Sequence, residues 1–338
     1  MGPVETSLRA QGAAITLRFG PAEAIERDLA ERRGRVLMAV RYGGPSSGLR
    51  ASDYPFVEVP TPILDDTPWL EIWGSSERAE CFRLGDVAWA EDGHALFGCC
   101  CRRLGGDVEQ DAHATFRDLL ALLDERGYPG LQRVWNHVPR INEERDRVER
   151  YRRFNVGRAR AFEERFGTGA EQHFPASSAV GTVGDMFIAC FAAARTHGTH
   201  LENPRQVSAY RYPPRYGPKS PSFARGTVAP ADWGHAFFLS GTASVVGHET
   251  MRIGDPHGQL DETLTNIDAL LDEVATRTGR GLDIARFDVL KVFIRHQEHF
   301  PTIRETLGRR LDAETPALYL HADICRSDLL VEIEGVSL

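Results

Sequence analysis

The chain has 338 residues, of which 42% are hydrophobic and 26% are charged. This composition is typical of a folded globular protein and not of a disordered one. The 48 acidic residues outnumber the 40 basic ones, for a net charge of −8. A general nucleic-acid-binding protein is therefore not expected, because such proteins need a positive field to displace counterions.

Targeting and cysteine signals agree with a protein that stays in the cytoplasm. The N-terminus has no apolar signal-peptide core, and no stretch approaches the roughly 20 apolar residues of a membrane span. The six cysteines contain no CxxC pair, and three of them are consecutive (residues 99–101). This pattern fits neither a disulfide framework nor a zinc site. We predict reduced thiols, a cytoplasmic location and no membrane partner.

Residues 1–34 are expected to be an N-terminal extension, and residues 35–200 a first α+β domain. Within that domain the strand-like run HALFGCCCRRL is followed by an amphipathic helical pattern that ends in ALLDE (residues 121–125). A strand RVWNH (residues 133–137), a second helical stretch and the apolar segment FPASSAVGTVGDMFIACFAA follow. The order β, α, β, α, β predicts an α+β unit with helices on one face of its sheet.

The helical stretch at residues 144–167 carries a candidate binding face. Val148, Tyr151, Asn155, Arg158 and Phe162 recur at spacings of three or four, which is one side of a helix. An arginine within an otherwise core-facing stripe needs a partner anion. Since this helix has many arginines, the alternative is that Arg158 is simply one more solvated side chain.

Between the predicted halves lies the loop NPRQVSAYRYPPRYGPKSPSFARG, residues 203–226, with five prolines and no acidic residue. The prolines exclude a helix, and long structured loops in compact proteins are usually functional. Arginines can hold carboxylates in a bidentate manner, and tyrosines add hydroxyl donors. A rigid linker whose cations pair with acidic surface is the alternative. The cationic and aromatic residues are Arg205, Arg211, Arg215, Lys219, Arg225, Tyr210, Tyr212, Tyr216 and Phe223.

Residues 201–338 repeat the first pattern and predict a second α+β domain that begins with this loop. ALLDE recurs at residues 269–273, an offset of 148, and KVFIR at residues 291–295 resembles RVWNH. The matched order of strands and helices indicates a duplication. Two HxxH pairs, His197/His200 and His296/His299, have no third ligand at a metal-like spacing. We therefore expect no metal, and we assign no role to His248 and Glu249.

The final strand, SDLLVEIEGVSL, places Glu332 and Glu334 on one face. The plain interpretation is a solvated face whose charges protect an edge strand. Aligning the halves at offset 143 sets Ala189 opposite Glu332 and Phe191 opposite Glu334, which suggests a covered face. Burial would raise the pKa of a carboxyl there and prepare it as a general acid.

The second half resembles a Rid/YjgF unit throughout. More specifically, YRRFNVGRARAF, the loop AYRYPPRYGPKSPSFARG, SGTASVVGHET and the terminal LLVEIEG together resemble the chorismatases, over about residues 35–338. These enzymes split chorismate into pyruvate and a benzoate or dihydrobenzoate product. The resemblance implies two tandem Rid/YjgF-like (chorismate-mutase-like) units, with no cofactor.

By the same resemblance, Tyr151, Arg158, Tyr212 and Arg225 match substrate-binding positions, and Glu332 matches the catalytic glutamate that protonates the enolpyruvyl group. Gly241 and Cys325 match the branch of the family that forms 3-hydroxybenzoate. Cys325 and Glu332 are separated by an odd number of residues, so both can reach one pocket only if a turn near Arg326 and Ser327 intervenes.

Several alternatives stay open at this stage. Other branches of the family hydrolyse chorismate to a dihydroxycyclohexadiene carboxylate or release a mixture of 3- and 4-hydroxybenzoate. A Rid-type imine deaminase would need a carboxylate-anchoring arginine where this chain has Ala317. A non-catalytic sensor of aromatic acids could use the same pocket. For the oligomeric state we favour a monomer, since fused units can bury the surface that Rid subunits share.

Overall fold

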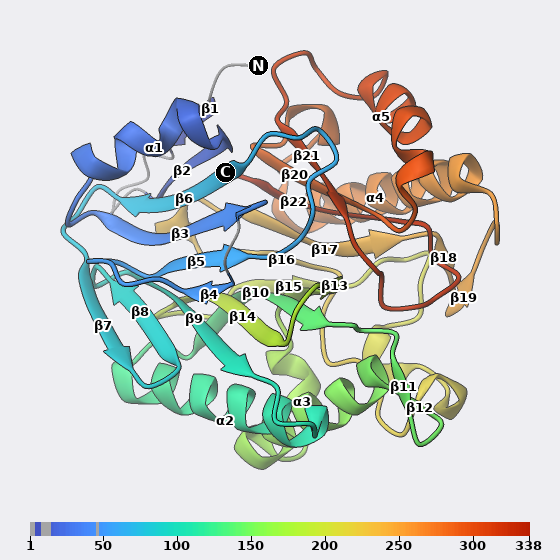
Figure 1. Ribbon diagram of the computed structural model, residues 1–338, viewed down its shortest axis with the longest axis horizontal. Coiled ribbons are helices and arrows are strands. Elements are labelled where there is room, and N and C mark those ends of the chain that lie inside the picture. Colours follow the sequence, from blue (N-terminus) through green and yellow to red (C-terminus); the bar gives the residue numbers. More distant parts are fainter. Residues whose placement is uncertain (1–3, 8–14, 45–46) are drawn as a thin grey trace.

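The computed structural model describes residues 4–7, 15–44 and 47–338. Three six-stranded sheets form the molecule, and each carries its helices on the outer face (Figure 1). We call the three parts unit 1 (residues 4–75), unit 2 (residues 80–194) and unit 3 (residues 199–337).

Unit 1 has strand order β1-β2-β6-β3-β5-β4, and the single helix α1 packs on its outer face. The apolar residues of α1, among them Ile25 and Leu29, pack on Ala39, Leu70 and Ile72 of the sheet. The elements are β1 (Val4–Ser7), β2 (Ile15–Pro21), α1 (Ala22–Glu31), β3 (Val36–Tyr42), β4 (Gly48–Leu49), β5 (Phe56–Val59) and β6 (Trp69–Ser75).

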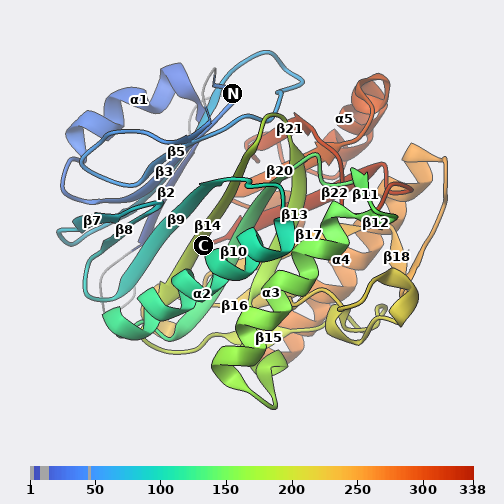
Figure 2. The same cartoon turned by 60° about the horizontal axis from the view of Figure 1, so that its bottom comes forward.

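Unit 2 has strand order β13-β10-β14-β9-β8-β7 and two long helices, α2 and α3, which lie side by side over the sheet (Figure 2). Asp107 caps α2 by accepting the amide hydrogens of Glu109 and Gln110, and Gly127 ends the helix in the left-handed region. The elements are β7 (Glu80–Leu84), β8 (Val87–Glu91), β9 (Ala95–Arg103), α2 (Val108–Arg126), β10 (Gly130–Pro139), β11 (Glu144–Arg145), β12 (Val148–Glu149), α3 (Arg150–Phe166), β13 (Ala176–Thr182) and β14 (Met186–Ala194).

Unit 3 has strand order β15-β16-β17-β22-β20-β21, covered by α4 and α5. Asp255 caps α4, and Pro256 occupies its first turn. The elements are β15 (Thr199–Leu201), β16 (Gly226–Val228), β17 (Phe237–Ala243), β18 (Val245–Val246), β19 (Glu249–Thr250), α4 (Pro256–Thr278), β20 (Val289–Ile294), α5 (Phe300–Gly308), β21 (Ala317–His321) and β22 (Val331–Ser337).

The predicted α+β duplication is present: both ALLDE segments lie in the corresponding helices α2 and α4. Unit 1 is a third copy of the same strand arrangement. In β2-β6-β3-β5, β9-β14-β10-β13 and β17-β22-β20-β21, the first two contacts are antiparallel and the third is parallel. Three similar units therefore surround one centre within a single chain.

The expected domain boundaries differ from this arrangement. The limit between residues 34 and 35 falls inside the sheet of unit 1, between α1 and β3, and the limit between residues 200 and 201 falls inside β15. The expected first domain, residues 35–200, thus combines part of unit 1 with unit 2. The sequence shows no repeat in unit 1 because its helix is short and the described residues between β3 and β5 form no helix.

The alignment of the two halves at offset 143 was wrong by an odd number of residues. Ala189 and Phe191 face the helices of unit 2, whereas Ile188 and Cys190 face the molecular centre. Glu332 and Glu334 alternate with Val331 and Ile333, which face the helices of unit 3, so the two carboxylates point inward. Because side chains alternate along a strand, a one-residue slip exchanges its two faces.

The inner faces of all three sheets meet in one apolar core. Trp73 of unit 1 stacks on Phe97 of unit 2 and lies against Phe238 of unit 3, with ring centroids 5.0 and 6.0 Å apart. Burial of this shared core joins the units into one body.

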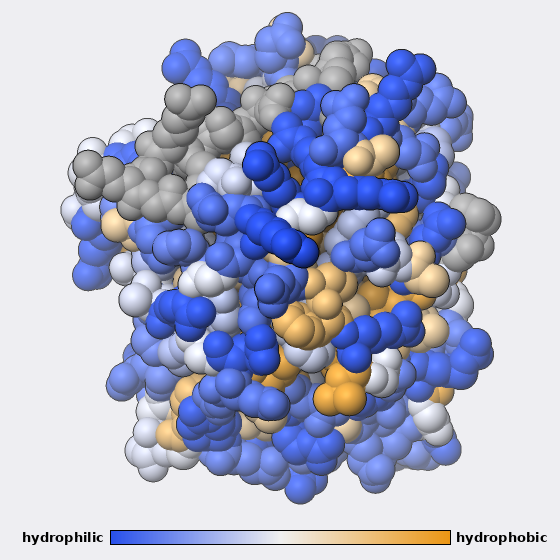
Figure 3. All heavy atoms as spheres, turned by 90° about the vertical axis from the view of Figure 1, so that its left-hand side faces the viewer, coloured by the Kyte–Doolittle hydropathy of each residue, from blue (hydrophilic) through white to orange (hydrophobic). Residues whose placement is uncertain are grey.

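The face of the molecule opposite the helices of unit 3 has little apolar surface that a further layer of structure could cover. Figure 3 shows this side mainly covered by hydrophilic side chains, with smaller hydrophobic areas between them. None of the helices in the described parts of the chain combines the length and apolar character that a membrane span requires.

Candidate active site

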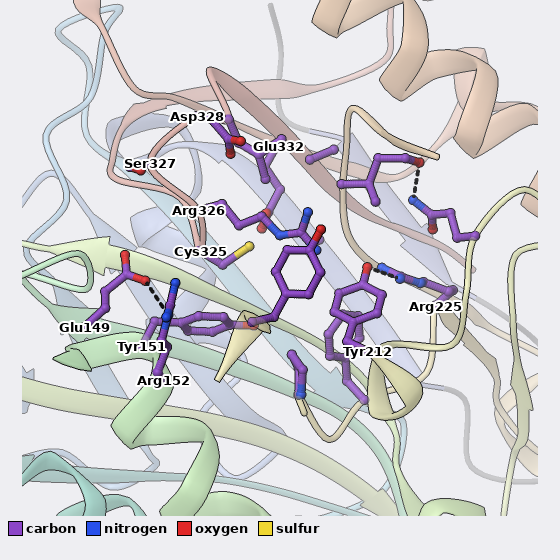
Figure 4. A pocket seen from close by; sticks show the side chains of 18 residues that line it. Glu149, Tyr151, Arg152, Tyr212, Arg225, Cys325, Arg326, Ser327, Asp328 and Glu332 are labelled. Atoms are coloured by element: carbon purple, nitrogen blue, oxygen red, sulfur yellow. Dashed lines mark hydrogen bonds and ion pairs between the residues drawn. The ribbon is translucent and has the colours of Figure 1, made fainter. Parts of the chain in front are cut away.

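A cavity of about 240 Å³ lies between units 2 and 3. Figure 4 shows its walls: α3 supplies Tyr151, the basic loop supplies Tyr212 and Arg225, and the segment before β22 supplies Cys325 and its neighbours. A smaller cavity of about 20 Å³ adjoins it and adds Arg158 and Ser178. All seven residues predicted for the site, Tyr151, Arg158, Tyr212, Arg225, Gly241, Cys325 and Glu332, line one or both cavities.

Glu332 lies in the middle of the sheet of unit 3, where β22 pairs with Ala243 of β17 and Phe293 of β20. Its side chain is 3% exposed. Within the described part of the chain, no hydrogen bond or ion pair reaches its carboxyl group. Burial, and then the charge of Glu334, raise the pKa of Glu332 to about 8, although Arg133, Arg225 and Arg295 oppose the rise. The carboxyl group therefore holds its proton at neutral pH, and the alternative of a solvated edge strand is wrong.

Gly241 leaves the space that the carboxyl group of Glu332 occupies. It lies where the pairing of β17 with β22 shifts register, between Leu239 and Thr242. A methyl group added at Gly241 would lie 2.2 Å from Oε1 of Glu332 and 3.1 Å from the Cβ atom of Ser178. Alanine at this position would force the carboxyl group to move.

Arg158 is a buried cation that pairs with no anion in the described part of the chain. It is 2% exposed, its guanidinium donates to Oδ1 of Asn155 at 3.0 Å, and its Nε has no partner among the described residues. The ring of Phe154 lies 4.9 Å from the guanidinium carbon. Burial lowers the pKa of Arg158 to about 10, so it stays charged at neutral pH. An unpaired charge in this environment calls for a bound anion.

Arg225 is a second such cation, at the end of the basic loop. It is 5% exposed and donates to the hydroxyl of Tyr212 at 2.7 Å and to the carbonyl of Val207 at 3.1 Å. No described residue contacts its Nε by a hydrogen bond. Tyr212 and Arg225, the two loop residues that the family resemblance assigns to substrate binding, are thus hydrogen-bonded to each other at the cavity wall.

Other cations of the loop form ion pairs with acidic residues, as the linker alternative predicts. Arg205 pairs with Glu262 at 2.6 Å, Arg215 with Glu249 at 2.5 Å, and Lys219 with Glu163 at 2.5 Å. These ion pairs fasten the loop to α4, the β18–β19 hairpin and α3. The loop therefore combines residues that fasten it to the rest of the protein with residues that line the cavity.

The turn that Cys325 requires is present. The amide of Leu329 donates to the carbonyl of Arg326, and the chain reverses before β22 begins. Burial raises the pKa of the Cys325 thiol to about 12, and the charge of Glu332 contributes, so the thiol is neutral. Cys325 and Glu332 consequently share one cavity despite their odd spacing.

Arg295, at the end of β20, holds this turn and was not identified from the sequence. Its guanidinium donates to the carbonyls of Ile324, Arg326 and Leu329 at 3.0, 2.8 and 2.7 Å. It also pairs with Asp323 at 2.6 Å. The only sequence signal was its position directly after a buried strand, which is shared by many residues that have no such role.

Arg326 is a second cavity residue that the sequence did not identify, since its position indicates only a turn. It lines the cavity, and its guanidinium carbon lies 4.2 Å from the ring centre of Tyr216 and 5.1 Å from that of Tyr212. It donates to the carbonyl of His248 at 2.9 Å. These contacts join the segment before β22 to the basic loop across the cavity.

Glu334 has a different environment from Glu332. Nζ of Lys291 lies 3.2 Å from one of its oxygens, and Arg133 contacts the other at 2.7 Å. Burial alone would raise the pKa of Glu334, but Lys291 and Arg133 outweigh it and hold the pKa below its usual value. Glu334 is therefore a charged neighbour that discourages ionisation of Glu332.

Comparisons with known proteins agree with this site. Residues 71–193 match the family model "Chorismatase FkbO/Hyg5-like, N-terminal". A chorismatase from Streptomyces rapamycinicus is 39% identical over 294 residues, which cover 85% of this chain and 87% of that protein. The chain belongs to the chorismatase family. A 3-hydroxybenzoate synthase from Streptomyces hygroscopicus is 38% identical over 299 residues, which cover 84% of this chain and 85% of that protein.

A solved structure shares nearly the whole fold of this chorismatase family member. The crystal structure of a chorismatase superposes with a TM-score of 0.89 at 33% identity, covering 98% of this chain and 100% of that one. The predicted family and α+β fold class are thus confirmed, and unit 1 is included in the match. An imine deaminase, the more remote alternative, is not supported by these relatives.

Proposed function

We propose that this protein cleaves chorismate to 3-hydroxybenzoate and pyruvate without a cofactor. The observation that carries the proposal is Glu332: a buried carboxyl group, without a partner, whose pKa is raised to about 8 beside a cavity. Such a group is a proton donor at neutral pH. The names of the relatives, chorismatase and 3-hydroxybenzoate synthase, support the substrate and the product.

Substrate binding in this proposal uses the two unpaired arginines. Chorismate carries two carboxylates, and Arg158 and Arg225 are two cations without ion-pair partners among the described residues. Tyr151 and Tyr212 flank them and can donate hydroxyl hydrogens. Bound in this way, the dianion would neutralise both buried charges and be fixed in one orientation, which lowers the entropic part of the barrier.

In the chemical step, Glu332 donates its proton to the methylene carbon of the enolpyruvyl group. This makes an oxocarbenium-like centre and weakens the ether bond to the ring. The ring hydroxyl next to that bond attacks the carbon from which the ether oxygen leaves, and pyruvate departs with both bonding electrons. The hydroxyl proton returns to the Glu332 carboxylate. The resulting arene oxide opens to 3-hydroxybenzoate, so no water is consumed.

We assign the choice between attack by the ring hydroxyl and attack by water to residues that lie next to Glu332. Gly241 leaves space beside the carboxyl oxygen, which permits the ring or the side chain to reorient. Cys325 places a neutral thiol at the same cavity, where its weak polarity holds water less firmly than a hydroxyl or carboxylate would. Both features favour attack by the ring hydroxyl over attack by water.

The test is to incubate purified protein with chorismate in water enriched in ¹⁸O and to identify the products by chromatography and mass spectrometry. The proposal predicts equal amounts of pyruvate and 3-hydroxybenzoate, with no ¹⁸O in the hydroxybenzoate. A dihydroxycyclohexadiene carboxylate as the main product, with or without ¹⁸O, would assign the protein to the hydrolytic branch. Unchanged chorismate would favour the sensor alternative.

A further inference from the structure

A second cavity, of about 380 Å³, lies between units 3 and 1. Its walls come from α5 and β21 of unit 3 and from β2, β6 and the segment before β6 of unit 1. The residues used below are Asp65, Trp69, Arg304, Leu311 and Tyr319. The volume lies in the range that small-molecule sites occupy.

This cavity corresponds in position to the candidate active site. In the active site, β13 of unit 2 forms an isolated bridge between Val180 and Ile324, in the segment before β22. At the second cavity, β21 of unit 3 forms the same kind of bridge between Leu320 and Ile63, in the segment before β6. Similar units thus enclose both cavities at similar junctions, as expected when one arrangement is repeated.

Three charged residues line the second cavity. Asp312 pairs with Arg286, whereas Asp65 and the exposed Arg304 take part in none of the ion pairs of the described residues. Oδ1 of Asp65 is buried without a hydrogen-bond partner, and burial raises the pKa of this carboxyl group. A ligand with both a cation and an anion would satisfy the two charges together.

The rest of the wall is mostly apolar or aromatic, with the hydroxyl-bearing Thr67 and Thr315 as further polar residues. Trp69 is 4% exposed, and none of the described residues forms a hydrogen bond with its Nε1. Tyr319 and Leu311 complete this side. Such a surface favours a flat apolar group in the ligand.

We propose that this cavity binds a free α-amino acid with an aromatic side chain. The carboxylate lies against Arg304, the ammonium group against Asp65, and the ring between Trp69 and Tyr319. No reaction is expected there, because Glu71, on the strand that corresponds to β22, contacts Lys291 at 2.7 Å and does not line this cavity. The site is independent of chorismate cleavage.

Calorimetric titration of the full-length protein tests the proposal with three probes: L-phenylalanine, 3-phenylpropionate, which lacks the ammonium group, and phenethylamine, which lacks the carboxylate. L-phenylalanine is expected to bind at least about tenfold more tightly than either analogue. Arg304→Gln and Asp65→Asn are each expected to weaken its binding about tenfold or more.

Two control variants make the result specific. Arg309→Gln removes an exposed arginine close to Arg304 that pairs with Glu305 and does not line the cavity, so L-phenylalanine binding is expected to be unchanged. Glu332→Gln, in the other cavity, is also expected to leave it unchanged. The proposal is overturned if L-phenylalanine does not bind, if the analogues bind equally well, or if Arg304→Gln leaves the affinity unaltered.

Discussion

Two buried glutamates at corresponding places in units 1 and 3 have opposite environments. Glu71 follows Ile63 by the same number of residues as Glu332 follows Ile324, and both side chains point to the inside of the molecule. Glu71 contacts Lys291 at 2.7 Å, the Tyr42 hydroxyl at 3.0 Å and the Trp73 indole at 2.8 Å. Glu332 has no such partner in the part of the chain that the structure describes, and it faces a cavity.

The difference shows how one position of a repeated fold can serve either stability or chemistry. A buried carboxylate with a cation and two hydrogen-bond donors is satisfied and stays in place. A buried carboxyl group without partners retains its proton, because ionisation would leave an uncompensated charge in the core. Arg133 could have neutralised Glu332 but pairs with Glu334 instead, at 2.7 Å. Glu332 therefore stays without an ion-pair partner among the described residues and is available to a substrate.

The largest expected effect comes from removing the acid. Glu332→Gln keeps the size of the side chain but has no proton to donate to carbon. We expect kcat for pyruvate release to fall by roughly a factor of 10³, while chorismate still binds. Stopped assays for pyruvate and a titration with chorismate measure the two quantities. Turnover close to that of the wild type would refute the assigned role.

The second prediction concerns stability and contrasts the same two residues. Glu71→Gln leaves Lys291 with Glu334 alone and is expected to lower the free energy of unfolding by about 3 kcal/mol. Glu332→Gln is expected to raise it at pH 7. The folded state holds the Glu332 proton up to a pKa of about 8, against an ordinary value of 4.5, so wild-type stability falls as the pH rises between these values.

Denaturant unfolding of the three proteins at several pH values measures this effect. The advantage of Glu332→Gln over the wild type should grow with pH, to roughly 3 kcal/mol at pH 7. An equal loss of stability in both variants would mean that the two glutamates are alike, and the contrast between the units would fail.

The third prediction distinguishes arginines that bind the substrate from an arginine that holds the loop in place. Arg158→Met and Arg225→Met each remove a cation that we assign to a substrate carboxylate, and kcat/KM should fall about 10- to 100-fold, mainly through KM. Arg215→Met is the matched control, since this loop residue pairs with Glu249 at the surface. If Arg225→Met and Arg215→Met had equal kinetics, the loop would act only as a linker and would not bind the substrate.

The smallest expected effect is a change in product ratio. The added methyl group of Gly241→Ala displaces the Glu332 carboxyl group, and Cys325→Ala leaves space for water at the same cavity. The double variant is expected to yield several-fold more of the hydrolysis product relative to 3-hydroxybenzoate, measured by chromatography. Cys81→Ala, at an exposed cysteine, is the control and should leave the ratio unchanged. An unaltered ratio in the double variant would remove these residues from product selection.

Much of the site could be predicted because its residues lie within short motifs. Arg158 was conspicuous on a core-facing helix side, and Arg225 lay in a loop without acids. The ion pair between Lys291 and Glu71 was invisible, because it joins strands of two different units. Unit 1 shares strand order with the others but lacks the repeated ALLDE helix.

The alignment of Ala189 with Glu332 failed for a similar reason. Apolar residues occupy both faces of β14, so the sequence carries no signal that fixes which face looks inward. The burial of Glu332 was nevertheless predicted correctly, because both faces of its strand are covered.

The most direct test of the account is the protonation state of Glu332 itself. Infrared difference spectra between the wild type and Glu332→Gln, recorded from pH 5 to pH 10, isolate the carboxyl band of this one residue. The account predicts a protonated carboxyl group at pH 7 that ionises around pH 8. A carboxylate that is already fully ionised at pH 6 would contradict it.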